Sequence, residues 1–142
     1  MNKIILASHG LLSAGMKDTV SMILGELPNV YAVATTRDET ESVATAAKRL
    51  LESFDSNDHV FILTDVMGGS VNNEMLSLLA EYPDLNVICG MNLSLVLNLA
   101  LLTDTLAKDE VQNIIEQSKE QIIYCSSILE NNEEEEDLLW LS

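Results

Sequence analysis

One histidine, one aspartate and a glycine-rich turn are the residues of this chain best placed to carry out chemistry. His9 follows a short apolar run near the N-terminus, and Asp65 follows another, with Gly68-Gly69-Ser70 shortly after it. A histidine can act as a nucleophile, a general base or a metal ligand. A carboxylate beside it would accept the proton of one ring nitrogen and leave the other nitrogen nucleophilic. Gly68-Gly69-Ser70 would open a helix whose backbone N–H groups can bind an anion.

Each of these residues also has an interpretation without chemistry. A lone histidine in a turn is often structural, and Asp65 can cap the helix that follows, although Ser70 is better placed for that role. Two adjacent glycines are common in plain turns. This turn lacks the lysine of a P-loop and the spacing of a dinucleotide fingerprint, so no cofactor is predicted. No second histidine and no Cys/His cluster lies near His9 at ligand spacing, so no metal is predicted either.

Strands and helices alternate along the chain as far as residue 125. Short apolar runs predict the strands, and apolar residues at helical spacing predict the helices between them. The expected strands cover residues 3–7, 29–35, 59–64, 86–89 and 121–125, and the expected helices cover residues 16–27, 43–54, 75–82, 93–102 and 105–119. This alternation predicts an α/β fold with a doubly wound, mostly parallel central sheet and helices on both faces. We expect the last strand to be antiparallel.

The predicted topology brings the candidate residues together. In an open α/β sheet, ligands bind at the carboxyl ends of the strands, where the strand order reverses. His9 and Asp65 both follow such strand ends, whereas His59 begins a strand and should be a surface histidine at the opposite end of the sheet. If the first and third strands are neighbours, His9, Asp65 and the glycine turn converge. That set of groups predicts phosphoryl transfer through a phosphohistidine.

The composition excludes several other classes of protein. The 142 residues include 7 Lys and Arg against 23 Asp and Glu, for a formal net charge of −16 at pH 7. This charge repels phosphate backbones and anionic lipids, so neither nucleic-acid nor membrane-surface binding is expected. No segment reaches the ~20 consecutive apolar residues of a membrane span. The apolar run at residues 4–8 is too short for a signal peptide, which favours a cytoplasmic protein.

The length predicts one domain followed by a tail. We expect a single domain over residues 1–130 and an acidic, solvated C-terminal tail over residues 131–142. Cys89 and Cys125 both lie among apolar residues, which predicts buried, reduced thiols rather than a disulfide.

Three segments of the chain resemble one protein family. They are residues 5–10 (ILASHG), residues 63–70 (LTDVMGGS) with Asn73, and residues 88–93 (ICGMNL). Their order and spacing resemble the EIIA domain of the mannose/fructose/sorbose phosphotransferase family. In one departure, Val71 and Asn72 stand where the family pattern GGSPxN has a proline and a variable residue.

The resemblance implies a role for each site residue. His9 would accept a phosphoryl group on Nε2 from the histidine phosphocarrier protein, HPr, and pass it to a histidine of an EIIB component. Asp65 would match the carboxylate paired with that histidine. Ser70 would match the hydroxyl of the phosphate loop, which also contains Gly68 and Gly69. Relatives are dimers that exchange a late strand, so the resemblance also implies a homodimer in which residues 121–125 are the exchanged strand.

Three other interpretations stay open at the level of sequence. A receiver domain phosphorylated on Asp65 would need an acidic pair after the first strand, where this chain has Ser8 and His9. A phosphorylation-sensing regulatory module of the same fold would use His9 only as a sensor. The phosphocarrier domain that serves dihydroxyacetone kinase shares the histidine site but delivers to a different acceptor.

Overall fold

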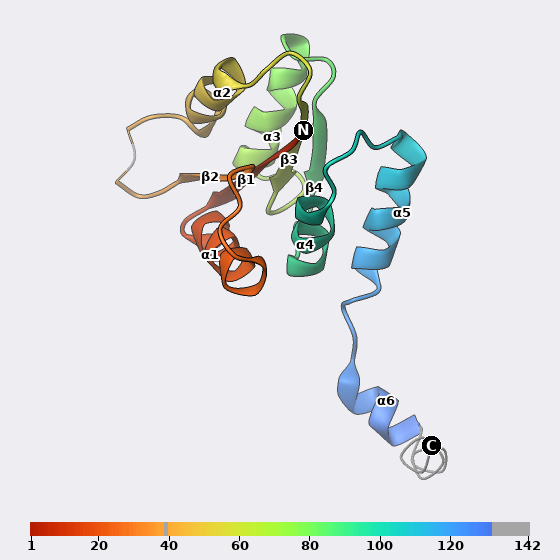
Figure 1. The fold of residues 1–142 in the computed structure, drawn as a ribbon. Helices are drawn as coiled ribbons and strands as arrows, with labels where there is room; N and C mark the ends of the chain where they lie inside the picture. The colour runs from red at the N-terminus through yellow and green to blue at the C-terminus, as the bar shows by residue number, and fades with distance from the viewer. Residues whose placement is uncertain (39, 132–142) are drawn as a thin grey trace.

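Four parallel strands form the centre of the computed structural model, which describes residues 1–38 and 40–131 (Figure 1). They are β1 (Asn2–His9), β2 (Val30–Thr35), β3 (His59–Thr64) and β4 (Asn86–Cys89). Their order across the sheet is β2-β1-β3-β4, so the strand order reverses between β1 and β3. The predicted α/β fold with a mostly parallel sheet is confirmed, and the first and third strands are neighbours.

Alternate side chains of the strands enter two hydrophobic cores, one on each face of the sheet. Ile4 and Leu6 of β1 belong to the first core, and Ile5 and Ala7 belong to the second. All four side chains are fully buried. The strand therefore reads as a continuous apolar run, as expected for a parallel strand covered on both faces.

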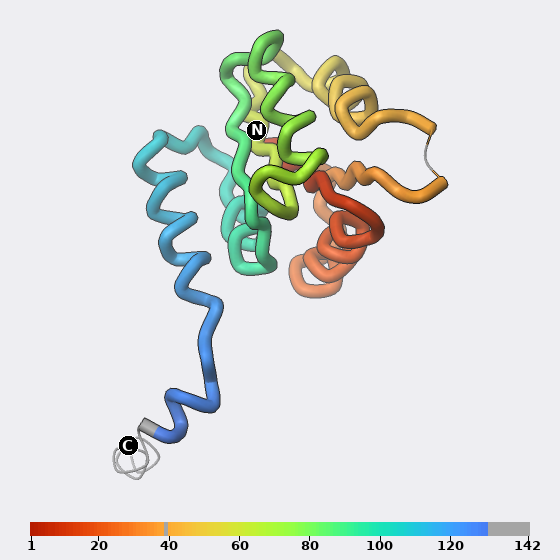
Figure 2. The backbone as a smooth tube through the Cα atoms, turned by 180° about the vertical axis from the view of Figure 1, so that it is seen from behind, coloured from red at the N-terminus to blue at the C-terminus, as the bar shows by residue number. Residues whose placement is uncertain are grey.

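Helices cover both faces of the sheet, as Figures 1 and 2 show from opposite sides. On the first core pack α1 (Leu12–Leu24) and α4 (Leu93–Leu101), with α5 (Lys108–Lys119) against α4. On the second core pack α2 (Val43–Ser53) and α3 (Ser70–Ser77), which continues into the 3-10 helix η1 (Leu78–Ala80). The predicted arrangement of helices on both faces is confirmed.

The helix boundaries differ from the predicted ones. α1 ends at Leu24 because Gly25 adopts a φ of 83°, outside the helical region, well before Pro28. α3 begins at Ser70 rather than at residue 75. Its first turn packs on the second core through Val71, but the other residues of that turn are polar, so the apolar spacing does not reveal the start of the helix.

The predicted strand over residues 121–125 is wrong for the single chain. After α5, residues 122–124 have no regular secondary structure, and α6 (Cys125–Asn131) begins directly afterwards. A strand needs a neighbour for its backbone hydrogen bonds, and here the chain leads away from the sheet (Figures 1 and 2). The sheet of the described residues therefore has four strands.

The environment of the cysteines differs from the prediction. Both are free, but Cys89 is half-buried at the end of β4, and Cys125 is exposed at the start of α6, outside both cores. The predicted acidic tail lies outside the described residues from residue 132 onward. Within residues 1–38 and 40–131, no helix has both the length and the apolar character needed to span a membrane.

Candidate active site

The His9 ring lies between two side chains that come from beyond the end of β3. Its Nδ1 is 2.7 Å from Oδ2 of Asp65, and its Nε2 is 3.1 Å from Oγ of Ser70. The histidine side chain stays 47% exposed, so a partner molecule can reach the ring. The structure thus brings together three residues that the sequence singled out, at the strand edge where they were expected.

Asp65 makes three hydrogen bonds that hold its carboxylate in place. Oδ2 accepts from the backbone N–H of His9 at 2.8 Å as well as from its ring, and Oδ1 accepts from the backbone N–H of Val66 at 3.0 Å. Only 10% of the side chain is exposed. Burial alone would raise the pKa of Asp65, but the hydrogen bonds and the charge of His9 outweigh it and lower the pKa.

An ionised Asp65 determines the tautomer of the histidine ring. A carboxylate can only accept a hydrogen bond, so Nδ1 of His9 must carry the proton and donate it. In the neutral ring the lone pair then lies on Nε2, which faces Ser70 and the solvent side of the site. Nε2 is therefore the ring nitrogen whose lone pair is available for chemistry.

Ser70 is not the helix cap that its position in the sequence favours. Gly69 occupies the N-cap position of α3 without a side-chain hydrogen bond, and Ser70 is the first helical residue. Asp65 does not cap the helix either, because its oxygens bind His9 and Val66. The Ser70 hydroxyl is consequently free to bond Nε2 of His9.

The two glycines are required by different features of the loop. Gly68 has a φ of 77°, a left-handed conformation that other residues rarely adopt. A Cβ atom on Gly69 would lie 2.9 Å from Cγ1 of Val66 and 3.3 Å from Cε1 of His9. Any side chain at position 69 would therefore displace the histidine ring or Val66.

The start of α3 favours an anion beside Nε2. The first N–H groups of a helix have no carbonyl partner within it, and the helix dipole places positive charge at this end. No acidic residue lies in the first turn of α3 to neutralise that charge. Because Ser70 both begins α3 and contacts Nε2, a phosphoryl group on this nitrogen would lie at the helix N-terminus.

Two buried serines that sequence reasoning missed hold the turn after His9. Ser8 Oγ accepts from the backbone N–H of Ser13 at 2.8 Å, and Ser13 Oγ donates to the carbonyl of Val33 in β2 at 2.9 Å. Gly10, with a φ of 59°, donates its N–H to the carbonyl of Thr35 at 2.8 Å. A serine at the end of a strand, a few residues before a helix, is the signal that could have identified Ser8.

His59 lies at the opposite end of β3, as predicted. It is half-buried, and its Nε2 is 3.1 Å from Oγ1 of Thr105 in an exposed contact. Within residues 1–38 and 40–131, no group of three or more His, Cys, Asp or Glu side chains could hold a metal ion.

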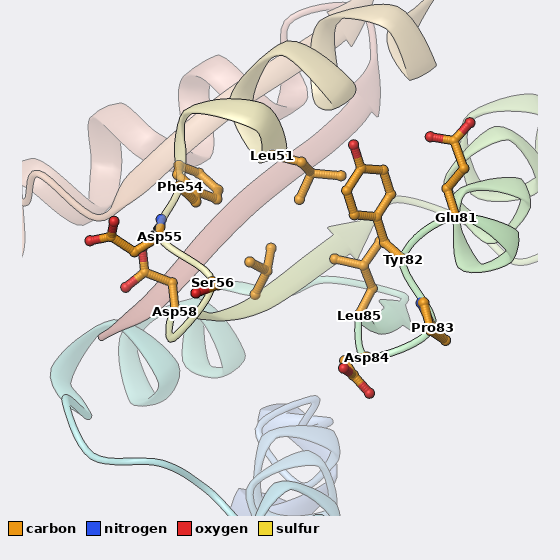
Figure 3. Close-up of a pocket in the computed structure, with 11 residues that line it drawn as sticks. Leu51, Phe54, Asp55, Ser56, Asp58, Glu81, Tyr82, Pro83, Asp84 and Leu85 are labelled. Atoms are coloured by element: carbon orange, nitrogen blue, oxygen red, sulfur yellow. Dashed lines mark hydrogen bonds between the residues drawn. The ribbon is translucent and has the colours of Figure 1, made fainter.

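A separate pocket opens at the amino ends of β3 and β4 (Figure 3). Tyr82 and Leu85 form part of its wall, and Asp58 and Asp84 lie at its acidic rim. None of the residues around His9 lines this pocket. It is therefore distinct from the histidine site.

Comparisons with known proteins find relatives that match most of the chain. The family model described as the fructose IIA component of the PTS matches residues 3–117. The fructose-specific EIIA component of Bacillus subtilis is 29% identical over 132 residues, which cover 92% of this chain and 90% of the relative. The sorbose-specific EIIA component of Klebsiella pneumoniae is 33% identical over 107 residues, 75% of this chain and 78% of the relative.

A solved structure is similar throughout the fold. The crystal structure of the phosphotransferase system component EIIA from Streptococcus agalactiae has a TM-score of 0.79 at 28% sequence identity. The match covers 89% of this chain and 99% of that chain.

The chain belongs to the mannose-type EIIA family of the sugar phosphotransferase system. It is a phosphoryl-carrier component of such a system, and membership of the family implies interaction with HPr and with an EIIB component. The resemblance seen in the sequence is confirmed, and the family excludes the receiver-domain interpretation.

The lowered pKa of Asp65 predicts how the stability of the protein depends on pH. Asn resembles the protonated acid, so Asp65→Asn should lower the free energy of unfolding by about 1 kcal/mol at pH 7. The ionised carboxylate contributes its full stabilisation above the pKa that Asp65 has in the unfolded chain, which is ~4. The pKa in the folded protein is lower, and the stabilisation is lost as the pH falls through that lower value. Denaturant unfolding of both proteins from pH 7 to pH 3 should show the difference closing below about pH 4. A difference that stayed constant would contradict this account.

Proposed function

We propose that His9 accepts a phosphoryl group on Nε2 from phospho-HPr and passes it to a histidine of the EIIB component. The observation that supports this most directly is the unequal environment of the two ring nitrogens. Nδ1 is held by Asp65, whereas Nε2 faces Ser70 and the start of α3. A ring held in this way presents one defined nucleophile to a partner protein.

The transfer exchanges one N–P bond for another. The lone pair of Nε2 attacks the phosphorus atom on the donor histidine, and the donor N–P bond breaks as the new bond forms. The electron pair of the broken bond returns to the donor ring. Nδ1 of His9 keeps its proton throughout, and Asp65 stabilises the positive charge that the ring gains. Transfer to EIIB reverses these steps on a new acceptor.

Ser70 and the first turn of α3 would stabilise the bound phosphoryl group. In the free protein the Ser70 hydroxyl is at hydrogen-bond distance from Nε2. Once Nε2 carries phosphorus, the same hydroxyl can donate to a phosphoryl oxygen instead, together with N–H groups of the helix start. Gly68 and Gly69 keep the loop free of side chains at this point.

Exposed apolar side chains next to His9 support transfer between proteins rather than to a small molecule. Leu11 and Leu12 follow His9, and Val66 and Met67 follow Asp65; all four are exposed, Met67 by 73%. Apolar residues gathered at a surface typically mark a protein–protein contact. Methionine in particular adapts to partners of different shape, which suits a carrier that must meet both a donor and an acceptor.

A cytoplasmic location is part of the same proposal. Cys89 and Cys125 are both free, which is usual in a reducing compartment.

His9→Ala should abolish phosphorylation. Incubation of the wild-type protein with phosphoenolpyruvate, enzyme I and HPr should add one acid-labile phosphate, measured by radiolabel or intact mass. The matched control is His59→Ala, which changes a histidine at the opposite end of β3 and should leave the labelling unchanged. Full labelling of the His9→Ala protein would end the proposal.

Asp65→Asn should slow phosphoryl transfer without abolishing it. Asn has no charge to stabilise the ring cation and can offer its N–H₂ group to Nδ1, which favours the wrong tautomer. Orienting carboxylates of this kind are worth up to ~10⁴-fold in rate, and we expect a smaller loss of about 10- to 10³-fold because no proton abstraction is needed. Stopped-flow or quench-flow transfer from phospho-HPr measures the rate, and a wild-type value would refute the assigned role.

We also propose that the protein is a homodimer that uses residues 121–125 at its interface. In this segment Ile122 is 83% exposed and Tyr124 is 78% exposed, and Ile123 is exposed as well. β4 is an edge of the sheet formed by the described residues. Pairing the segment antiparallel with the sheet of a second copy would cover a sheet edge and bury these side chains. Such an interface is isologous, so both histidine sites are equivalent.

Truncation tests the dimer. A chain that ends at Lys119 should be an unstable or aggregating monomer, because the interface segment is missing. A chain that ends at Glu130 keeps the segment and should remain a dimer in sedimentation analysis. If the shorter chain stayed folded and dimeric, the proposed interface would be wrong.

A further inference from the structure

We propose that Asn72 is a positioning residue for phosphoryl transfer, and that it acts through a buried hydrogen bond with Thr64. Oγ1 of Thr64 donates to Oδ1 of Asn72 at 2.7 Å. Thr64 is fully buried and Asn72 is only 3% exposed, so water does not compete for this bond. The inference rests on the proposed role of His9.

The two residues stand at the two ends of the loop that carries the site. Thr64 ends β3 and directly precedes Asp65, while Asn72 lies in the first turn of α3, close after Ser70. Asp65 and Ser70 in turn bind the two nitrogens of the His9 ring. A bond between Thr64 and Asn72 therefore fixes the distance between the groups on either side of that ring.

The environment of Asn72 determines the direction of the bond. Its Nδ2 is 3.8 Å from Sδ of Met67, in the middle of the same loop, and a thioether sulfur can only accept a hydrogen bond. The amide nitrogen therefore faces Met67, and Oδ1 must face the Thr64 hydroxyl as the acceptor. Asn72 thus links the strand end, the middle of the loop and the helix start.

The family pattern does not assign this role. In GGSPxN, Asn72 occupies the variable position, and the asparagine of the pattern corresponds to Asn73. Asn73 makes a different contact, because its Nδ2 lies 3.4 Å from the carbonyl of Gly68. The two neighbouring asparagines therefore play different parts in the loop: Asn72 binds Thr64 below it, and Asn73 contacts Gly68 within it.

Two substitutions of Thr64 distinguish a role in positioning the site residues from a role in the stability of the fold. Thr64→Val keeps the shape of the side chain and removes the hydroxyl, whereas Thr64→Ser keeps the hydroxyl and leaves a methyl-sized gap. A positioning role predicts that Thr64→Val lowers the rate constant for transfer from phospho-HPr by about 10-fold, since a misplacement of about 1 Å can cost ~10²-fold and a smaller one costs less. Thr64→Ser should transfer at close to the wild-type rate although its core is less well filled. A purely structural role predicts instead that Thr64→Ser, with its gap in the core, transfers more slowly than Thr64→Val.

Asn72→Leu completes the test. It should slow transfer to the same extent as Thr64→Val, and the double variant should be no slower than either single one, because both remove one interaction. The control is Asn29→Leu, which removes another buried asparagine, one that donates to the carbonyl of Asn2 at the far end of β1. Thermal melts give the folded fraction of each variant, and ¹⁵N spectra of the His9 ring report its environment directly.

The outcomes separate this inference from the proposed function. Slow transfer by Thr64→Val and Asn72→Leu, with normal transfer by Thr64→Ser and Asn29→Leu, supports the positioning role. Wild-type transfer rates in Thr64→Val and Asn72→Leu overturn it. It is also overturned if the transfer rates of all the variants fall in proportion to their loss of thermal stability. In either case a His9→Ala protein that takes no label leaves the proposed function intact. A labelled His9→Ala protein refutes the proposed function itself.

Discussion

One carboxylate oxygen joins the two central strands at the reactive edge of the sheet. Oδ2 of Asp65 accepts hydrogen bonds from both the backbone N–H and the ring of His9. The residue that ends β1 and the residue that follows β3 are thereby tied together, and the ring is oriented by the same contact. Burial opposes ionisation of Asp65, but its hydrogen bonds overcome this and lower its pKa. The tautomer of His9, and with it the nucleophilic character of Nε2, depends on that ionised state.

The winding of the sheet makes this contact possible. After β1 the chain enters α1 on one face, and after β3 it enters α3 on the other, so the two connections diverge and leave the histidine accessible between them. Both helices begin close to His9. Leu12, the first residue of α1, follows His9 closely in the sequence, and Ser70, the first residue of α3, contacts the His9 ring. Positive helix ends at this edge favour a phosphoryl group on a protein whose net charge is −16.

A carrier has to expose its reactive atom to two proteins in turn, and the site reflects this. His9 is nearly half exposed, while the groups that orient it are covered: Asp65 is 10% exposed, and the pair Thr64 and Asn72 lies below the surface. The groups that orient the ring are therefore shielded from solvent, whereas the ring itself is accessible. Exposed apolar residues such as Met67 beside the histidine add a surface that proteins can contact without a closing lid.

The sequence alone determined the parts of this protein that depend on local pattern. The strands at residues 59–64 and 86–89 have the predicted boundaries, and His9 and Asp65 follow strand ends as expected. Only the tertiary structure decided what depends on residues distant in the chain. It made Ser70 a partner of His9 rather than a cap, brought Thr64 and Asn72 together below the loop, and left residues 122–124 without a strand. Periodicity records which side chains are buried, but a hydrogen bond or a strand pair needs a second group whose position is set by the fold.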